Sequence, residues 1–177
     1  MMGLRFALLL FLALFPCCPA ALAQNAPGGI GARHDSSQPI EITADTLDVS
    51  QTDQTALFSG KVVAVQGEMR LGSDNLRVHY REQGAQAGNG AISRLDAIGN
   101  VTVSSPTEMA QGEWGVYDVD TEQITMGGNV VLTRGGNVLR GEQLVIDLES
   151  GQSRITSKKD GGGRVKGLFV PSKKPSQ

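Results

Sequence analysis

The sequence predicts an all-β fold of stacked strands, in which two facing sheets enclose an apolar interior. Related segments recur at a fixed spacing along the chain, and apolar residues alternate with polar ones within each segment. Alternation with a period of two is typical of strands that have one buried face. The chain also has 23 glycines and only 5% aromatic residues, which is poor material for a compact helical core. We therefore expect almost no helix.

The length and the charge of the chain exclude several classes of protein. With 177 residues, it has room for one domain or two very small ones. The 16 Lys and Arg residues are balanced by 18 Asp and Glu, a net charge of -2, which argues against nucleic-acid binding of the ordinary basic kind. A hydrophobic content of 40% excludes a disordered chain.

Residues 1–23 are predicted to be a cleaved secretory signal. Arg5 precedes an apolar run over 6–15, and Ala21-Leu22-Ala23 supplies small residues at positions −3 and −1 of a cleavage site. A retained anchor needs about 20 apolar residues, and a lipoprotein linked through Cys17 is a further alternative. Because both cysteines, Cys17 and Cys18, lie in this segment, the mature chain would have no thiol. The signal indicates export to a bacterial periplasm.

Three regions are expected after the signal. A flexible leader over 24–37 precedes a β-domain over 38–171, and a basic flexible tail over 172–177 ends the chain. Charge is divided unevenly, because 24–153 has 8 basic and 17 acidic residues whereas 154–177 has 7 basic and 1 acidic.

A sequence repeat underlies the β-domain, and its period is the distance from Gly99 to Gly128. Each unit has a glycine followed by an acid at a constant spacing, and another glycine follows the acid. The glycine–acid pairs are Gly60 and Asp74, Gly99 and Glu113, and Gly128 and Glu142. One unit is longer by a polar, Gly-rich stretch, 82–91, which we expect to be a surface loop. A unit of this size cannot bury its own apolar face, so the units must stack, with open edges at the first and last strands.

The strands are expected in the following order. The first unit begins at 40–49; strands around the glycines follow at 56–64, 95–103 and 124–132; strands after the acids lie at 74–78, 113–117 and 142–146; and 164–170 is the final alternating segment. Small residues before each acid, such as Gly112 and Gly141, change the alternation and predict a bend or bulge. Gly115 stands where other units have Leu, which would open or flatten that unit.

The interior positions carry mostly small aliphatic residues, which would leave room for an aliphatic ligand; a filled core is the alternative. The expected groove-lining residues are Phe58, Val62, Leu76, Val101, Ile124, Met126, Val130 and Leu144.

Motifs for catalysis or metal binding are not found in the sequence. His34 and His79 have no Cys or Glu at metal-ligand spacing, and no nucleophile elbow or phosphate-binding loop opens a helix. The recurring acids would repel one another if stacked about 4.8 Å apart, so we expect them in solvent at a corner. We expect no catalytic residue, no metal site and no cofactor.

The repeated units resemble the OstA-like repeat of the LptA family of periplasmic lipopolysaccharide-transport proteins. Each has Gly-x-Val-x-Val or a close variant, followed by an acid and an alternating strand. The lead-in Gln38-Pro-Ile-Glu-Ile-Thr-Ala-Asp45 and the closing Gly163-Arg-Val-Lys-Gly-Leu-Phe-Val-Pro171 are similar to the first and last strands of that family. The resemblance implies a twisted β-jellyroll of two facing antiparallel sheets with open ends, whose hydrophobic interior carries lipid acyl chains.

The resemblance also implies partners. Family members dock edge to edge with the periplasmic domains of LptC at the inner membrane and LptD at the outer membrane, and they pass lipopolysaccharide along this bridge. In this chain the docking edges would be Ile40 and Ile42 at one end and Val165 and Leu168 at the other, which also predicts a head-to-tail homo-oligomer. The rival interpretations are a structural or adhesive β-solenoid with a filled core, and a carbohydrate-active enzyme, which would need clustered inward carboxylates.

Overall fold

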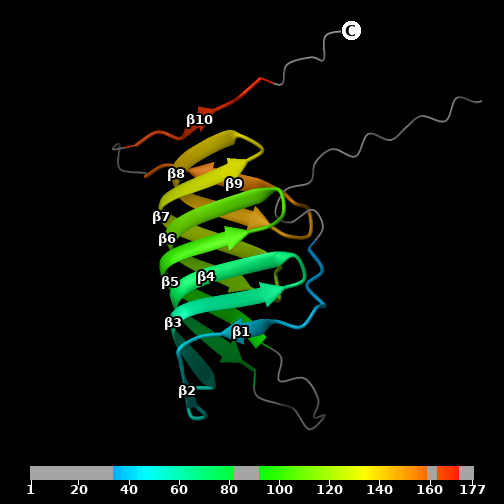
Figure 1. Ribbon diagram of the computed structural model, residues 1–177, viewed down its shortest axis with the longest axis vertical. Coiled ribbons are helices and arrows are strands. Elements are labelled where there is room, and N and C mark those ends of the chain that lie inside the picture. The colour runs from blue at the N-terminus through cyan, green and yellow to red at the C-terminus, as the bar shows by residue number, and fades with distance from the viewer. Residues whose placement is uncertain (1–33, 82–91, 159–162, 172–177) are drawn as a thin grey trace, which may run out of the picture.

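The computed structural model describes residues 34–81, 92–158 and 163–171, and all the regular secondary structure in these ranges is β (Figure 1). The strands are β1 (Glu41–Thr43), β2 (Thr46–Ser50), β3 (Thr55–Gln66), β4 (Met69–Tyr80), β5 (Ile92–Ser104), β6 (Glu108–Asp118), β7 (Gln123–Arg134), β8 (Asn137–Asp147), β9 (Ser153–Thr156) and β10 (Lys166–Leu168). Within the same ranges no helix is long and apolar enough to cross a membrane.

The strands form one antiparallel sheet in the order β1-β3-β4-β5-β6-β7-β8-β10, with β2 paired to β3 and β9 paired to β8. From β3 to β8, each strand lies beside its neighbours in sequence, and the sheet does not close. The predicted all-β fold with open ends is therefore confirmed. One repeat of the sequence corresponds to a pair of adjacent antiparallel strands.

Each long strand bends near its middle and so contributes to two facing layers. At the bend of β3 the ladder register shifts between Ser59 and Val62, and equivalent shifts occur in the later pairs. The two residues that cause each shift have left-handed backbones, as in Gly60 (φ 85°) and Lys61 (φ 49°). Layer A holds the segments 41–43, 62–72, 101–111, 130–140 and 166–168, and layer B holds 46–59, 75–80, 92–98, 114–127 and 143–156.

The corner acids lie against the glycines of the next strand. An added Cβ at Gly99 would overlap the Asp74 carboxylate, and the Asn100 side chain donates a hydrogen bond to the same carboxylate at 2.8 Å. Asn129 donates to Glu113 at 3.1 Å in the next unit. The acids are not stacked in neighbouring strands: they occupy alternate strands, about 10 Å apart, with a glycine-bearing strand between them. They are in solvent at a corner, as predicted.

The core lies between the two layers and is filled by alternate side chains of β3 to β8. Gly115 does not open this core. It pairs in register with Ala97 and Met126, and an added Cβ there would lie 3.2 Å from Val101. The expected flattening is thus wrong, because the neighbouring Val101 and Met126 side chains occupy the space that leucine fills in other units. The predicted loop over 82–91, the signal and the tail lie outside the described residues.

Replacing Gly99 by Ala should destabilise the domain by about 2 kcal/mol or more, because alanine is strained in the left-handed backbone of this position and its Cβ would displace Asp74. Gly135→Ala is the matched control, since Gly135 is also left-handed but has no neighbour within 4 Å of an added Cβ; it should lose only about 1 kcal/mol. Urea unfolding measures both. Equal losses would contradict a special role for the acid–glycine contact.

Candidate functional site

The predicted groove residues all lie in the core between the layers. Seven of them are at most 2% exposed, and Phe58 is half-buried against the same cluster. The structure therefore brings them together on inward faces of β3 to β8. In this state they belong to one packed cluster, and within the described residues no open channel runs beside the seven buried ones.

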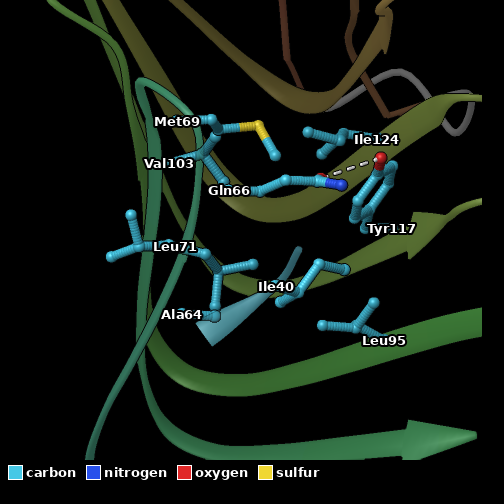
Figure 2. A pocket seen from close by; sticks show the side chains of 10 residues that line it. Ile40, Ala64, Gln66, Met69, Leu71, Leu95, Val103, Tyr117 and Ile124 are labelled. Atoms are coloured by element: carbon cyan, nitrogen blue, oxygen red, sulfur yellow. Dashed lines mark hydrogen bonds between the residues drawn. The ribbon is translucent and has the colours of Figure 1, made fainter. Parts of the chain in front are cut away.

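A pocket opens into the interior on the side of the stack, between residues of β3 to β7 and Ile40 (Figure 2). Ile40, Leu71, Leu95, Val103 and Ile124 supply apolar walls from both layers, and Met69 lies at the rim. Its free space is about 20 Å³, room for about one water molecule. An acyl chain does not fit here unless a wall moves.

Residues 34–40, named the N-terminal strap, cover this pocket. The buried Gln66, at the β3–β4 turn, donates from Nε2 to the carbonyl oxygens of Ser36 and Gln38, both at 2.9 Å. The Ser36 hydroxyl donates to Glu122, at the β6–β7 turn, at 2.5 Å. In Figure 1 the strap leaves β1 and runs along the side of the sheet where the hairpin turns gather. The strap thus links a turn of layer A to a turn of layer B.

A buried tyrosine completes the network beneath the strap. The Tyr117 hydroxyl donates to Gln66 Oε1 at 3.2 Å and lies 3.3 Å from His34 Nε2 (Figure 2 shows the first bond). Burial, with a smaller contribution from Glu122, raises the pKa of Tyr117 to about 12. Burial also lowers the pKa of His34 below 6.5, against opposing contributions from Gln66, Glu122 and Asp35. Both rings are therefore neutral near pH 7.

A second, open mouth lies at the C-terminal end of the interior. It has a volume of about 470 Å³, and Leu132, Leu139 and Phe169 form its apolar part. At its rim Arg134 forms an ion pair with the buried Glu108. The interior is thus covered by the strap on the side lined by β3 to β7 and accessible at the C-terminal end.

The two edges of the stack expose apolar side chains. Val165 and Leu168, which the sequence predicts for docking, are 45% and 62% exposed at the C-terminal edge. Ile40 and Ile42 instead pack against the core. At the N-terminal edge the exposed apolar residues are Leu47 and Val49, at 53% and 64%. By the alternation of the repeat, both residues point inward. They are exposed because β2 ends the described stack and no further strand covers them.

The edges also differ in charge. Exposed acids at the N-terminal edge include Glu41, Asp45 and Asp48. The C-terminal edge has an open polar pocket of about 320 Å³, whose basic side chains are Arg140, Lys158, Arg164 and Lys166. Lys158 is 3.6 Å from Glu142, which repeats the acid–polar contact of the earlier corners.

No group of three possible metal ligands occurs within residues 34–81, 92–158 and 163–171. His79 contacts Asp96 at 2.8 Å and His34 contacts Tyr117, so each histidine has a partner other than a metal. Three polar residues of the described chain are buried, and Glu108 is the one carboxylate among them. The clustered inward carboxylates that a glycosidase needs are not found in this part of the chain.

Comparison with known proteins identifies related sequences. A family model described as LptA/(LptD N-terminal domain) LPS transport protein matches residues 41–152. An uncharacterized protein of Rhizobium meliloti is 34% identical over 150 residues, which are 82% of this chain and 79% of the relative. Lipopolysaccharide export system protein LptH of Pseudomonas aeruginosa is 24% identical over 148 residues, 80% of this chain and 77% of LptH. LPS-assembly protein LptD of Vibrio cholerae is 30% identical over 89 residues, 50% of this chain but 10% of LptD.

A solved structure shows the same fold. The crystal structure of LptH, described as the LptA-homologous periplasmic component of the lipopolysaccharide transport device of Pseudomonas aeruginosa, superposes with a TM-score of 0.67. It is 18% identical and covers 78% of this chain and 99% of LptH. The unclosed antiparallel sheet is thus an architecture already known from experiment.

Lowering the pH from about 7.5 to about 5.5 should loosen the strap. Because burial lowers the pKa of His34, a detached His34 binds a proton more readily than a docked one, so the docked state loses stability as the pH falls through about 6.5. Hydrogen-exchange protection of residues 36–40 should fall accordingly. His34→Gln cannot titrate and should show no such change; equal pH dependence in both proteins would contradict the role of His34.

Proposed function

Because the chain belongs to the LptA/LptD N-terminal domain family of lipopolysaccharide transport proteins, we propose that it is a periplasmic bridge that binds lipopolysaccharide acyl chains in its interior and passes the lipid from the inner to the outer membrane. The observation that carries this proposal is the apolar interior between two layers of an unclosed sheet. The predicted signal over 1–23 supports the location. The description of LptH as a periplasmic component supports it too.

The energetics favour this use of the interior. Burial of an acyl chain contributes about 0.8 kcal/mol per methylene, so a chain of about ten methylenes supplies ample affinity without a charged pocket. The proposed path is lined by the inward residues Phe58, Val62, Leu76, Val101, Ile124, Met126, Val130 and Leu144. Because these side chains are packed together here, binding requires the two layers to separate.

The alternative function is a structural or adhesive β-solenoid. The filled core favours it, because the pocket beneath the strap holds only about 20 Å³ of free space. The open mouth at Leu132, Leu139 and Phe169 favours the carrier instead. Lipid binding separates the two.

The proposed partners are LptC on the inner-membrane side, the periplasmic domain of LptD on the outer-membrane side, and further copies of this chain arranged head to tail. In the described fold β1 and β2 pair only with β3, and β9 and β10 pair only with β8. Each end therefore has unpaired backbone groups that accept a strand. The exposed Leu47 and Val49 at one end and Leu168 at the other would be buried by docking.

The internal ladders predict the register of a head-to-tail contact. The residues that follow the corner acids lie at one level across the sheet. Thr46 and Asn75, for example, pair with Ser59 from its two sides. Thr156 of β9 already pairs with Gln143, which follows Glu142. If the pattern continues, Thr46 of a second copy lies opposite Thr156.

This register places Asp48 of the second copy opposite Arg154. Both side chains are exposed. Asp48 lies two residues after Thr46, and Arg154 lies two residues before Thr156 on the opposing antiparallel strand. The acidic N-terminal edge would thus meet the basic C-terminal edge, which favours head-to-tail contacts over edge pairs of like charge.

A photo-reactive residue at Val130 should cross-link lipopolysaccharide, whereas one at Thr102, on the opposite face of its strand, should not. The reason is that inward positions contact acyl chains and outward positions contact solvent. Gel analysis after irradiation with purified lipopolysaccharide measures both. Equal labelling would reject the assignment of the interior, and no labelling at Val130 in a folded variant would favour the structural solenoid.

Reversing the charge at the docking edges should weaken self-association. Asp48→Arg or Arg154→Asp alone would place like charges opposite each other and reduce the association constant about tenfold, which is roughly 1.4 kcal/mol. The double variant should recover to within about twofold, as measured by light scattering over a concentration series.

Arg70→Asp, a like change at an exposed residue near the start of β4, which is paired on both sides, is the control for net charge and should have little effect. If the double variant associates as weakly as the single ones, the proposed register is wrong. If the wild type stays monomeric and binds neither partner domain, the bridge function fails for this chain.

A further inference from the structure

We infer that the pocket beneath the N-terminal strap is an entry port for a hydrocarbon chain, and that residues 34–40 and the lipid compete for it. This inference rests on the proposed function, because the lipid is the cargo of the proposed carrier. It adds the place where the interior opens and the segment that closes it.

The site beneath the strap has the chemistry of a hydrocarbon site. Its walls are aliphatic and come from both layers, through Leu71 and Val103 of layer A and Leu95 and Ile124 of layer B. The polar atoms lie at one rim, where Gln66 and Tyr117 form their hydrogen bonds. A site with apolar walls and a single polar rim fits an acyl chain that enters from the side while its polar head stays outside.

A side chain of the strap, Ile40, occupies the place that we propose for the hydrocarbon chain. Ile40 points between the two layers toward Leu95 and Ala64, in the position that an entering hydrocarbon would take (Figure 2). It packs against the core cluster although it lies outside any strand. With Ile40 in place the site is nearly full, so strap and lipid cannot occupy it together.

The strap can leave without disrupting the sheet. The β1 ladder begins at Glu41, and residues 34–40 form no ladder pair with any strand. They are held by side-chain bonds from Gln66 and Ser36 and by the contact of His34 with Tyr117. Water can replace each of these bonds when the strap detaches, but water cannot cover the apolar walls favourably. The open port is therefore stabilised when an acyl chain replaces Ile40.

The free volumes show why a wall has to move at the strap. The C-terminal mouth is already open, with about 470 Å³. The pocket beneath the strap has about 20 Å³ while the strap is docked. The strap spans the turns of both layers, so its release frees those turns to separate.

The test fixes the strap in place. Ser36 and Glu122, whose side chains are 2.5 Å apart, are replaced by cysteines in a full chain in which Cys17 and Cys18 are replaced by serine. A short bis-methanethiosulfonate reagent joins the two thiols, and reductant releases them. A photo-reactive residue at Met69, at the rim of the port, reports the arrival of purified lipopolysaccharide. Labelling at Met69 should fall at least tenfold in the cross-linked protein and return on reduction.

Two controls make the result specific. Cysteines at Ser50 and Asp53, whose side chains are 2.7 Å apart within one turn, carry the same cross-link without spanning the port and should leave labelling unchanged. A photo-reactive residue at Leu139, in the open C-terminal mouth, should label in both states. A thermal melt checks that each protein is folded.

A loosened strap supplies the opposite change. Tyr117→Phe keeps the ring but removes the hydroxyl that contacts Gln66 and His34, so labelling at Met69 should rise about threefold or more. If Met69 labels equally with the strap fixed, free or loosened while Leu139 labels, the port is refuted and the carrier function stands. If neither position labels in any folded variant, lipid binding by the chain is refuted, and the port with it.

Discussion

The whole architecture depends on one local constraint, the paired left-handed residues that bend β3, β5 and β7. A glycine followed by Lys or Asn, as at Gly99 and Asn100, turns the strand out of one layer and into the other. The acid of the preceding strand covers the glycine and accepts a hydrogen bond from the asparagine. Because these bends share one level in the stack, the sheet folds into two layers along a single line. The interior between the layers, the pocket beneath the strap and the open C-terminal mouth all result from this fold of the sheet.

The repeat spacing predicts much of the fold because it reflects contacts between neighbouring strands. The strands, the bends and the inward residues could be read from alternation and from the glycine–acid spacing. The relation between acids could not, because the same period fits both a solenoid coil and a pair of antiparallel strands. Only the ladders show that Asp74 lies against Gly99 rather than against another acid.

The repeat and the alternation of apolar residues could not predict contacts between residues far apart in the sequence. Nothing around His34 or Ser36 indicates partners at Tyr117 and Glu122, more than eighty residues away. The segment 24–37 is polar and rich in glycine, so the sequence predicts a flexible leader, yet its described part crosses the pocket. Likewise, Leu47 has the alternation of a core residue, and its exposure arises only because β2 ends the described stack.

The pairing of each long strand with its neighbour in sequence also determines how the chain is expected to fold. Most contacts close short loops, so strands can add one at a time to a growing sheet, and the entropic barrier to each step is small. The strap is the exception, because residues 34–40 are made before residues 117–122 and cannot dock until those are present. During synthesis the apolar walls of the pocket therefore stay uncovered until about two thirds of the chain has been made. A partly made chain is for that reason the form most prone to aggregate, and the form for which a chaperone that binds apolar strands would matter most.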